Sequence, residues 1–532
     1  MLFGMAALLI ASSQPAAAAD SGFPGGKSRW RLHRSPHFEL YTNDSGWRAV
    51  DTLGDLELLR AFFLEQARLR EHRPIPVTVF LFADESDFQA CLPTTVNREN
   101  RLRGLHLPQA DRTTILLTPS DNEASSPLVV RHEFVHHLFR VAEENPPVWF
   151  NEGMAELYST VAVERGKLMF GRPPLGRLRA LQQEKLMPLE QLVATGRESA
   201  LYRGNDHTGI FYAQSWLLVH FCHFGAVDIP LENRLRFLAV ARSPEVHDNP
   251  ALLREASRQL LGWDLARLTK ELNSYASAGR YQARSAPPPP VPEAKTYTVE
   301  DVPPATMRLR LAEVLVRTRQ DPRAEFALLE AAGAGDTRAS EVLGTLARYK
   351  GDMVAMQERW QKALAAETPN PAVAQEYVEH RTRQLFARFD PYYRMPAELG
   401  EELRSCLLRS IAATPEQSRA YEMLAWIEAS APEPVVANLN TVQRRFGQLK
   451  ARDRTLVALA CARHHLGKDA EALQLLDQLP DLAPDSWSGE AAETLRAKIE
   501  GRKPVREKPG TRPKPPAFTP PIKIKPMSEA PQ

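Results

Sequence analysis

The chain has 532 residues, of which 43% are hydrophobic and 25% charged, and its formal net charge is +2. This length exceeds what one hydrophobic core supports, so we expect two or three domains. After the N-terminus no apolar run is long enough to span a bilayer, and no nucleic-acid recognition motif or phosphate-binding glycine loop is present, which argues against membrane-spanning and nucleic-acid-binding functions.

Residues 1–19 resemble a secretory signal peptide. Leu2–Ala11 is a short apolar stretch, and Ala17-Ala18-Ala19 before Asp20 is a small-residue cleavage pattern. The positive charges that usually precede such a stretch are missing, so a disordered cytosolic leader is the alternative. We favour export, to a periplasm or the exterior.

The four cysteines are far apart in the sequence and have no CxxC spacing. This pattern fits neither a disulfide scaffold nor a cysteine-based metal site. We expect buried thiols, with a Cys91–Cys222 disulfide left open as compatible with export. The positions are Cys91, Cys222, Cys406 and Cys461.

The segment from residue 28 to residue 125 alternates between strand and helix patterns. The apolar, β-branched run Pro76–Phe82 is typical of a central strand. The order of elements favours a small mixed sheet of the α+β class. Strands are predicted at Trp30–Thr42, Pro76–Phe82, Gly104–Pro108 and Thr113–Thr118, and helices at Val50–Arg70 and Asp84–Leu92.

The next helix carries the motif His132-Glu133-Phe134-Val135-His136. Ser126-Pro127 is a good helix start, with a serine cap and proline at the first helical position. On a helix His132 and His136 are one turn apart, so both imidazoles can bind one metal ion. Glu133 lies beside them, where a general base for a bound water belongs. The alternative is a buried amphipathic helix whose histidines cap or pair with carboxylates.

A second helix is expected to fold back over the histidine pair. Asn145-Pro146-Pro147 interrupts the chain, since residues before proline avoid the helical region. A helix beginning near Pro147 then carries Glu152 and Glu156. Two histidines leave a tetrahedral zinc short of a protein ligand, and Glu152 is the candidate third ligand. Glu156, one turn later, is placed to accept a hydrogen bond from a ligating histidine.

The histidine motif followed by Trp149-Phe150-Asn151-Glu152-Gly153-Met154-Ala155-Glu156 resembles the gluzincin zinc peptidases, the thermolysin and aminopeptidase relatives. It is closer to a bacterial group with a "peptidase MA-like" domain, often exported or joined to helical repeats. The resemblance implies a zincin-like domain over residues 28–283, Glu152 as third ligand and Glu156 as the brace of a ligand histidine. It also implies that an edge strand, here Thr113–Leu117, aligns the substrate by backbone hydrogen bonds.

Two features refine what the resemblance implies about activity. The Gly-Ala-Met-Glu-Asn segment with which aminopeptidases hold a substrate's amino terminus is missing, so an endopeptidase is expected. Tyr212 matches a tyrosine that stabilises the tetrahedral intermediate in gluzincin aminopeptidases; a packed core tyrosine is the equal alternative. His207 is a rival donor. The other nearby histidines, His137, His220 and His223, are expected to be surface or satisfied core residues.

The proline run Ala286–Pro292 marks the clearest boundary, and we expect a proline-rich linker over residues 284–303. Residues 304–500 are helical in pattern. Leu343–Pro371 and Ala458–Asp485 share a layout of helix, short turn and helix, with Ser418–Leu449 as a weaker copy. This layout resembles tetratricopeptide (TPR) repeats, which usually bind a peptide or protein partner. A plain helical bundle is the alternative.

The tail, residues 501–532, is rich in proline and lysine and is predicted to be disordered. Its net charge of +6 would suit an anionic surface, although a solvated appendage is the more frequent explanation.

The sequence therefore predicts an exported, zinc-dependent metallopeptidase that acts on a peptide or protein substrate. Its ligands would be His132, His136 and Glu152, with Glu133 as general base and Tyr212 as oxyanion donor. The alternative is a non-catalytic assembly protein whose TPR-like repeats hold a protein partner and whose zincin-like domain is a scaffold.

Overall fold

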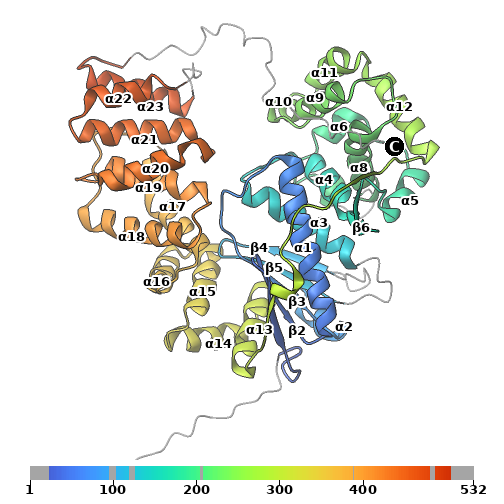
Figure 1. Ribbon diagram of the computed structural model, residues 1–532, viewed down its shortest axis with the longest axis horizontal. Coiled ribbons are helices and arrows are strands. Elements are labelled where there is room, and N and C mark those ends of the chain that lie inside the picture. The colour runs from blue at the N-terminus through green and yellow to red at the C-terminus, as the bar shows by residue number, and fades with distance from the viewer. Residues whose placement is uncertain are drawn as a thin grey trace, which may run out of the picture.

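The structure is a computed structural model that describes residues 23–94, 104–118, 126–203, 208–387, 389–479 and 486–504. The signal-peptide prediction, His207 and residues 505–532 of the predicted tail lie outside these ranges. Within them, no helix is both long and apolar enough to cross a membrane. The protein is a mixed α/β structure in which a small mixed sheet is surrounded by many helices (Figure 1). This agrees with the small mixed sheet and the many helices expected from the sequence.

The central sheet has six strands in the order β4-β5-β3-β2-β1-β9. The adjacent strands β2, β3 and β5 are parallel, and the other pairs are antiparallel. The single strand expected over Trp30–Thr42 is instead an antiparallel hairpin of β1 and β2. The strands are β1 (Arg31–Arg34), β2 (Phe38–Thr42), β3 (Val77–Leu81), β4 (Gly104–Pro108), β5 (Thr113–Leu117) and β9 (Thr298–Asp301).

Two helices cover one face of this sheet, namely α1 (Gly46–Ala67) and α3 (Ser126–Val141), which lie side by side in Figure 1. Val79 of β3 points to this face and packs in one core with Phe63 of α1 and Phe134 of α3. Successive strand residues point to opposite faces, so the neighbouring Phe80 belongs to the other face. The continuous apolar run of β3 is thus explained by burial on both sides.

The opposite face is covered by helices that follow the proline-rich segment. Phe80 and Phe82 pack in one core with Leu311 and Leu315, which lie on α13. The hydrophobic core therefore continues across the boundary expected at residue 304. The helices of this face are α2 (Glu85–Cys91), α13 (Pro304–Arg319), α14 (Pro322–Gly333) and α15 (Thr337–Lys350).

The proline-rich segment itself is extended, but it is not a free spacer. β8 (Arg284–Ala286) pairs with β7, and β9 pairs with β1 at the edge of the central sheet. The segment thus adds a strand to each sheet and leads the chain from one face of the central sheet to the other. The second sheet consists of β6 (Ala162–Glu164), β7 (Lys167–Phe170) and β8.

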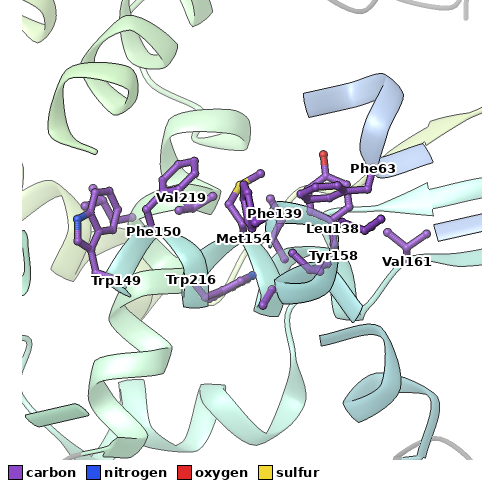
Figure 2. Packing of buried hydrophobic residues seen from close by; sticks show 14 of the residues in the cluster. Phe63, Leu138, Phe139, Trp149, Phe150, Met154, Tyr158, Val161, Trp216 and Val219 are labelled. Atoms are coloured by element: carbon purple, nitrogen blue, oxygen red, sulfur yellow. The ribbon is translucent and has the colours of Figure 1, made fainter. Parts of the chain in front are cut away.

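Helix α3 packs against α4 (Val148–Ser159), which packs in turn against α8 (Thr208–Phe224). Figure 2 shows the large side chains of this core, among them Phe139, Trp149 and Met154. At Gly153 the two helices α4 and α8 approach so closely that a Cβ atom would lie 2.6 Å from the Ser215 carbonyl oxygen. This glycine therefore sets the separation of α4 and α8 next to Glu152.

Shorter helices complete this part of the protein. They are α5 (Leu175–Gln183), α6 (Leu189–Val193), α7 (Ala200–Arg203), α9 (Leu231–Ala241), α10 (Pro244–Asp248), α11 (Leu252–Ala256) and α12 (Leu265–Ala278).

The remaining helices form a curved arm, coloured orange to red in Figure 1, with its own core around Trp360, Tyr377 and Trp426. All secondary structure described from residue 304 to residue 504 is helical, as expected. The helices of this arm are α16 (Met353–Leu364), α17 (Pro371–Ala387), α18 (Ala397–Ala413), α19 (Ser418–Ser430), α20 (Val436–Arg445), α21 (Arg452–His465), α22 (Asp469–Leu476) and α23 (Trp487–Ile499).

The four cysteines are buried free thiols, as expected. Cys91 belongs to the core on the α13 face of the sheet and Cys222 to the core on the α3 face. The Cys91–Cys222 disulfide that the sequence left open is not formed.

Candidate metal centre

Three side chains from α3 and α4 converge on one point. The Nε2 atoms of His132 and His136 lie 3.2 Å apart. Glu152 Oε2 lies 3.2 Å from His132 Nε2 and 3.5 Å from His136 Nε2. Within the described ranges, this is the one group of three or more histidine, cysteine or acidic side chains that could hold a metal ion. The structure thus brings together the three residues predicted as ligands.

The tight connection between α3 and α4 produces this convergence. Helix α3 ends as Glu143 adopts a left-handed backbone conformation with φ of 52°, and the Glu144 N–H donates to the Phe139 carbonyl. Pro146 and Pro147 then prevent the helix from continuing, and α4 begins at Val148. Glu152 is consequently placed in the second turn of α4, opposite the histidine pair.

The other ring nitrogen of each histidine faces an oxygen acceptor. His136 Nδ1 lies 2.9 Å from Asn151 Oδ1, and His132 Nδ1 lies 3.4 Å from Glu156 Oε1. Both acceptors favour a proton on Nδ1, which leaves the Nε2 lone pairs facing each other and Glu152. Three electron-rich atoms at such distances repel one another unless a proton or a cation lies between them.

Glu156 occupies the predicted bracing position, and Arg177 of α5 holds it there. The Arg177 Nε and a terminal nitrogen donate to Glu156 Oε1 over 2.8 Å and 2.6 Å. The same guanidinium lies 4.8 Å from the centre of the Tyr212 ring. Arg177 thus contacts both Glu156 Oε1, which lies beside His132, and the ring of Tyr212.

The electrostatics of the site favour a positive charge. Burial alone would raise the pKa of Glu152, but its contacts with His132 and His136 hold that pKa well below its usual range. Burial likewise opposes protonation of His136, yet the hydrogen bond and charge of Glu152 raise the pKa of His136 to about 9. Glu152 is therefore an ionised carboxylate inside the protein, and a cation between the imidazoles would be stabilised by it.

The donor set fits a zinc ion. Nitrogen and oxygen ligands about 2.0–2.1 Å from a tetrahedral zinc are separated by about 3.3–3.4 Å. The three separations here, 3.2, 3.2 and 3.5 Å, are close to that value. With both Nε2 atoms unprotonated, Glu152 Oε2 is also a buried oxygen without a hydrogen-bond donor among the described residues. Two imidazoles and one carboxylate are typical of a catalytic zinc site that keeps one position for water.

Glu133 and Tyr212 both lie near the three ligands. Glu133 remains partly exposed, and its Oε2 lies 3.5 Å from Nδ1 of His106 on β4. The Tyr212 ring centre lies 6.3 Å from that of His132. Burial, followed by the charge of Glu152, raises the pKa of Tyr212, so its phenol stays protonated and can act as a donor.

Tyr202 of α7 is part of the site, although no sequence pattern distinguishes it from the other tyrosines. Its hydroxyl donates to Glu152 Oε1 over 3.0 Å, and its ring stacks on that of Tyr212 with centres 6.2 Å apart. Because the carboxylate is planar, a hydrogen bond that holds Oε1 also fixes the direction of Oε2. No spacing or periodicity in the sequence connects a tyrosine 50 residues later to this carboxylate.

Other histidines near the motif are accounted for by the core. His137 is buried with Nδ1 2.9 Å from Thr113 Oγ1. His220 is buried with Nε2 2.7 Å from the Gly171 carbonyl oxygen. Both are satisfied core histidines, as expected. His223, at the end of α8, is not among the three converging residues.

The prediction that Thr113–Leu117 is an edge strand that aligns the substrate is wrong. As β5 it pairs with β3 on one side and β4 on the other, and all five of its residues are buried. The edge of the sheet beside α3 is β4. Gly104 of β4 lies against α3, because a Cβ there would meet Val129 Cγ1 at 2.8 Å.

The chain was also compared with protein-family models, with curated proteins and with solved structures, and none of them matches it.

Proposed function

We propose that this chain is an exported zinc-dependent metallopeptidase of the gluzincin type, with a zincin-like fold around α3 and α4. The observation that carries the proposal is the triangle of His132 Nε2, His136 Nε2 and Glu152 Oε2, with separations of 3.2, 3.2 and 3.5 Å. Glu133 on the same helix supplies the base that such a site needs.

Zinc in this site would lower the pKa of a bound water and polarise the carbonyl of a peptide bond. Glu133 is the partly exposed carboxylate next to the ligands, and it accepts the proton of the attacking water and returns it to the leaving amine. His132, His136 and Glu152 would hold the metal, and Asn151 and Glu156 fix the orientation of the two imidazoles.

Tyr202 and Tyr212 have different roles in this proposal. Tyr202 donates to Glu152 Oε1 and keeps Oε2 directed at the histidines. The ring centre of Tyr212 lies 6.3 Å from that of His132, and its phenol is protonated. In this proposal the phenol donates a hydrogen bond to the substrate carbonyl oxygen as negative charge develops there.

The substrate in this proposal is an extended peptide bound along β4. Among the described residues this strand is the edge of the sheet on the side of α3, so its outer backbone groups face no other described strand and can pair with an added one. Backbone pairing does not read side chains, and a broad endopeptidase specificity follows. The proposed TPR-like character of residues 304–500, α13 to α23, would supply a surface for a protein partner, and export is inferred from the sequence pattern of residues 1–19.

The test is metal content and hydrolysis measured on the same preparation. We expect about one zinc per chain, and loss of that zinc in His132→Ala. Glu133→Gln should keep the metal but reduce digestion of casein or a peptide library by about 100-fold or more. Full activity in Glu133→Gln would remove the assigned base. A chain that holds zinc but cleaves no peptide would favour the assembly-protein alternative.

A further inference from the structure

The edge strand β4 carries a side chain that the metal site as described above does not use. His106 lies on the same strand face as Gly104, which packs against Val129 of α3. Since Val129 and Glu133 are one helical turn apart, His106 is directed at Glu133. Its Nδ1 lies 3.5 Å from Glu133 Oε2.

His106 is almost fully buried, with a side-chain exposure of 7%. Its Nε2 has no hydrogen-bond partner among the described residues. Burial, followed by the nearby charges of His136, Arg140 and His132, lowers the pKa of His106 to about 3, so the ring is neutral at ordinary pH. A neutral imidazole carries one proton, and the carboxylate beside Nδ1 favours that proton on Nδ1.

This arrangement is costly for a residue with only a packing role. A buried ring nitrogen without a partner lowers the free energy of unfolding, and an apolar side chain of similar volume would avoid that cost. The partial compensation comes from the Nδ1–H facing Glu133. Catalytic hydrogen bonds are often long before substrate binds, so a separation of 3.5 Å fits a contact that tightens during the reaction.

We propose that His106 is a positioning residue for Glu133: its Nδ1–H holds Oε2 of the carboxylate and leaves Oε1 free to take the proton of water. The proposal rests on the peptidase function proposed above. It assigns to the edge strand a second task besides pairing with substrate, namely fixing the rotamer of the base.

Two substitutions separate positioning from packing. In His106→Asn the amide nitrogen takes the place of Nδ1 and can still donate to Glu133. In His106→Leu the volume is kept and the donor is lost. We expect kcat to fall at least tenfold in His106→Leu with KM within twofold, while Tm is unchanged or higher. His106→Asn should keep kcat within about threefold of the wild type. Wild-type kcat in His106→Leu, or equal losses in both variants, would overturn the proposal.

A readout that does not depend on hydrolysis is the tautomer of His106 in the full chain. We would label histidine with ¹⁵N, assign the His106 signals by their loss in His106→Asn, and read the two nitrogen shifts in the metal-free protein. A proton on Nδ1 that moves to Nε2 in Glu133→Ala supports the contact. A proton on Nε2 in the wild type overturns it. If the wild type cleaves no peptide, the peptidase proposal fails while the tautomer still decides the role of His106.

Discussion

The hydroxyl of Tyr202 donates a hydrogen bond of 3.0 Å to Glu152 Oε1, the carboxylate oxygen that faces away from the histidine pair. A metal ligand held on its outer side keeps its orientation when the metal leaves. The short helix α7 is thereby linked to the metal centre, although it contributes no ligand.

Tyr202→Phe should therefore weaken zinc binding without abolishing it. Loss of one hydrogen bond to a ligand typically reduces metal affinity by about 10- to 100-fold. Competition with a chromophoric chelator measures the change. Tyr275→Phe is the matched control, because that phenol contacts His220 outside the metal centre. Equal zinc affinities in Tyr202→Phe and the control would show that Tyr202 does not orient Glu152.

Gly153→Ala should displace Glu152 by forcing α4 away from α8. The added Cβ would lie 2.6 Å from the Ser215 carbonyl oxygen and 2.8 Å from Val219 Cγ2. Overpacking of this kind costs about 1–3 kcal/mol of unfolding free energy, and we expect zinc affinity to fall with it.

The control for Gly153→Ala is Gly54→Ala within α1, where a Cβ meets nothing within 4 Å. Alanine at such a helical position stabilises by about 0.5–1 kcal/mol. Urea unfolding and the chelator assay on both variants check the pair. A Gly153→Ala protein as stable as the wild type would contradict the close approach of the two helices.

The convergence of His132, His136 and Glu152 could be predicted because each step is local. The helical repeat places two histidines on one face, and two prolines in the connection make the second helix fold back. Tyr202 and His106 could not be predicted, since each reaches the site through the tertiary arrangement and neither has a distinctive sequence spacing.

Strand order is the part of the fold that the family resemblance misjudged, because it implied an edge position for Thr113–Leu117. β4 and β5 are both short strands in the sequence, and only their pairing shows that β4 is the edge. The apolar run of β3 did indicate a central strand. It could not indicate that α13 to α15, beyond the proline-rich segment, cover Phe80 and Phe82.

A chain ending at residue 303 should accordingly fail to fold as a soluble domain. It would expose Trp30, Phe80 and Phe82, all at most 1% exposed in the full chain. Each such side chain contributes about 1.5–3 kcal/mol on burial, and the total is comparable with the stability of a domain. We expect aggregation, or binding of a hydrophobic dye.

The matched chain ends at residue 351 and keeps α13 to α15, so the second sheet face is covered and the apolar face of α16, which belongs to the core of the arm, is absent. We expect it to be soluble and to unfold cooperatively in urea. Size-exclusion chromatography of both chains checks the prediction. A soluble, cooperatively folded 23–303 chain would show that the boundary expected at residue 304 does separate two independent domains.

A buried histidine should make the stability of the protein depend on pH. His220 of α8 has Nε2 2.7 Å from the Gly171 carbonyl oxygen and Nδ1 2.9 Å from the Tyr275 hydroxyl. A neutral ring with its proton on Nε2 satisfies both contacts, because it donates to the carbonyl and accepts from the phenol. Burial lowers the pKa of His220 to about 4, against the opposing effect of its backbone hydrogen bonds.

In the unfolded chain the pKa of histidine is about 6.5. As the pH falls from about 6.5 to about 4, the unfolded chain takes up a proton that the folded protein does not, and the free energy of unfolding decreases. This one group accounts for about 3 kcal/mol over that interval and for no change above it. His220→Gln can still donate to Gly171 but cannot titrate. We expect the variant to be less stable than the wild type at about pH 7 but to lose less stability on acidification to about pH 4.5.

Urea unfolding of both proteins at the two pH values measures the stability at neutral pH and its decrease on acidification. An equal decrease in variant and wild type would show that His220 is not the titrating group.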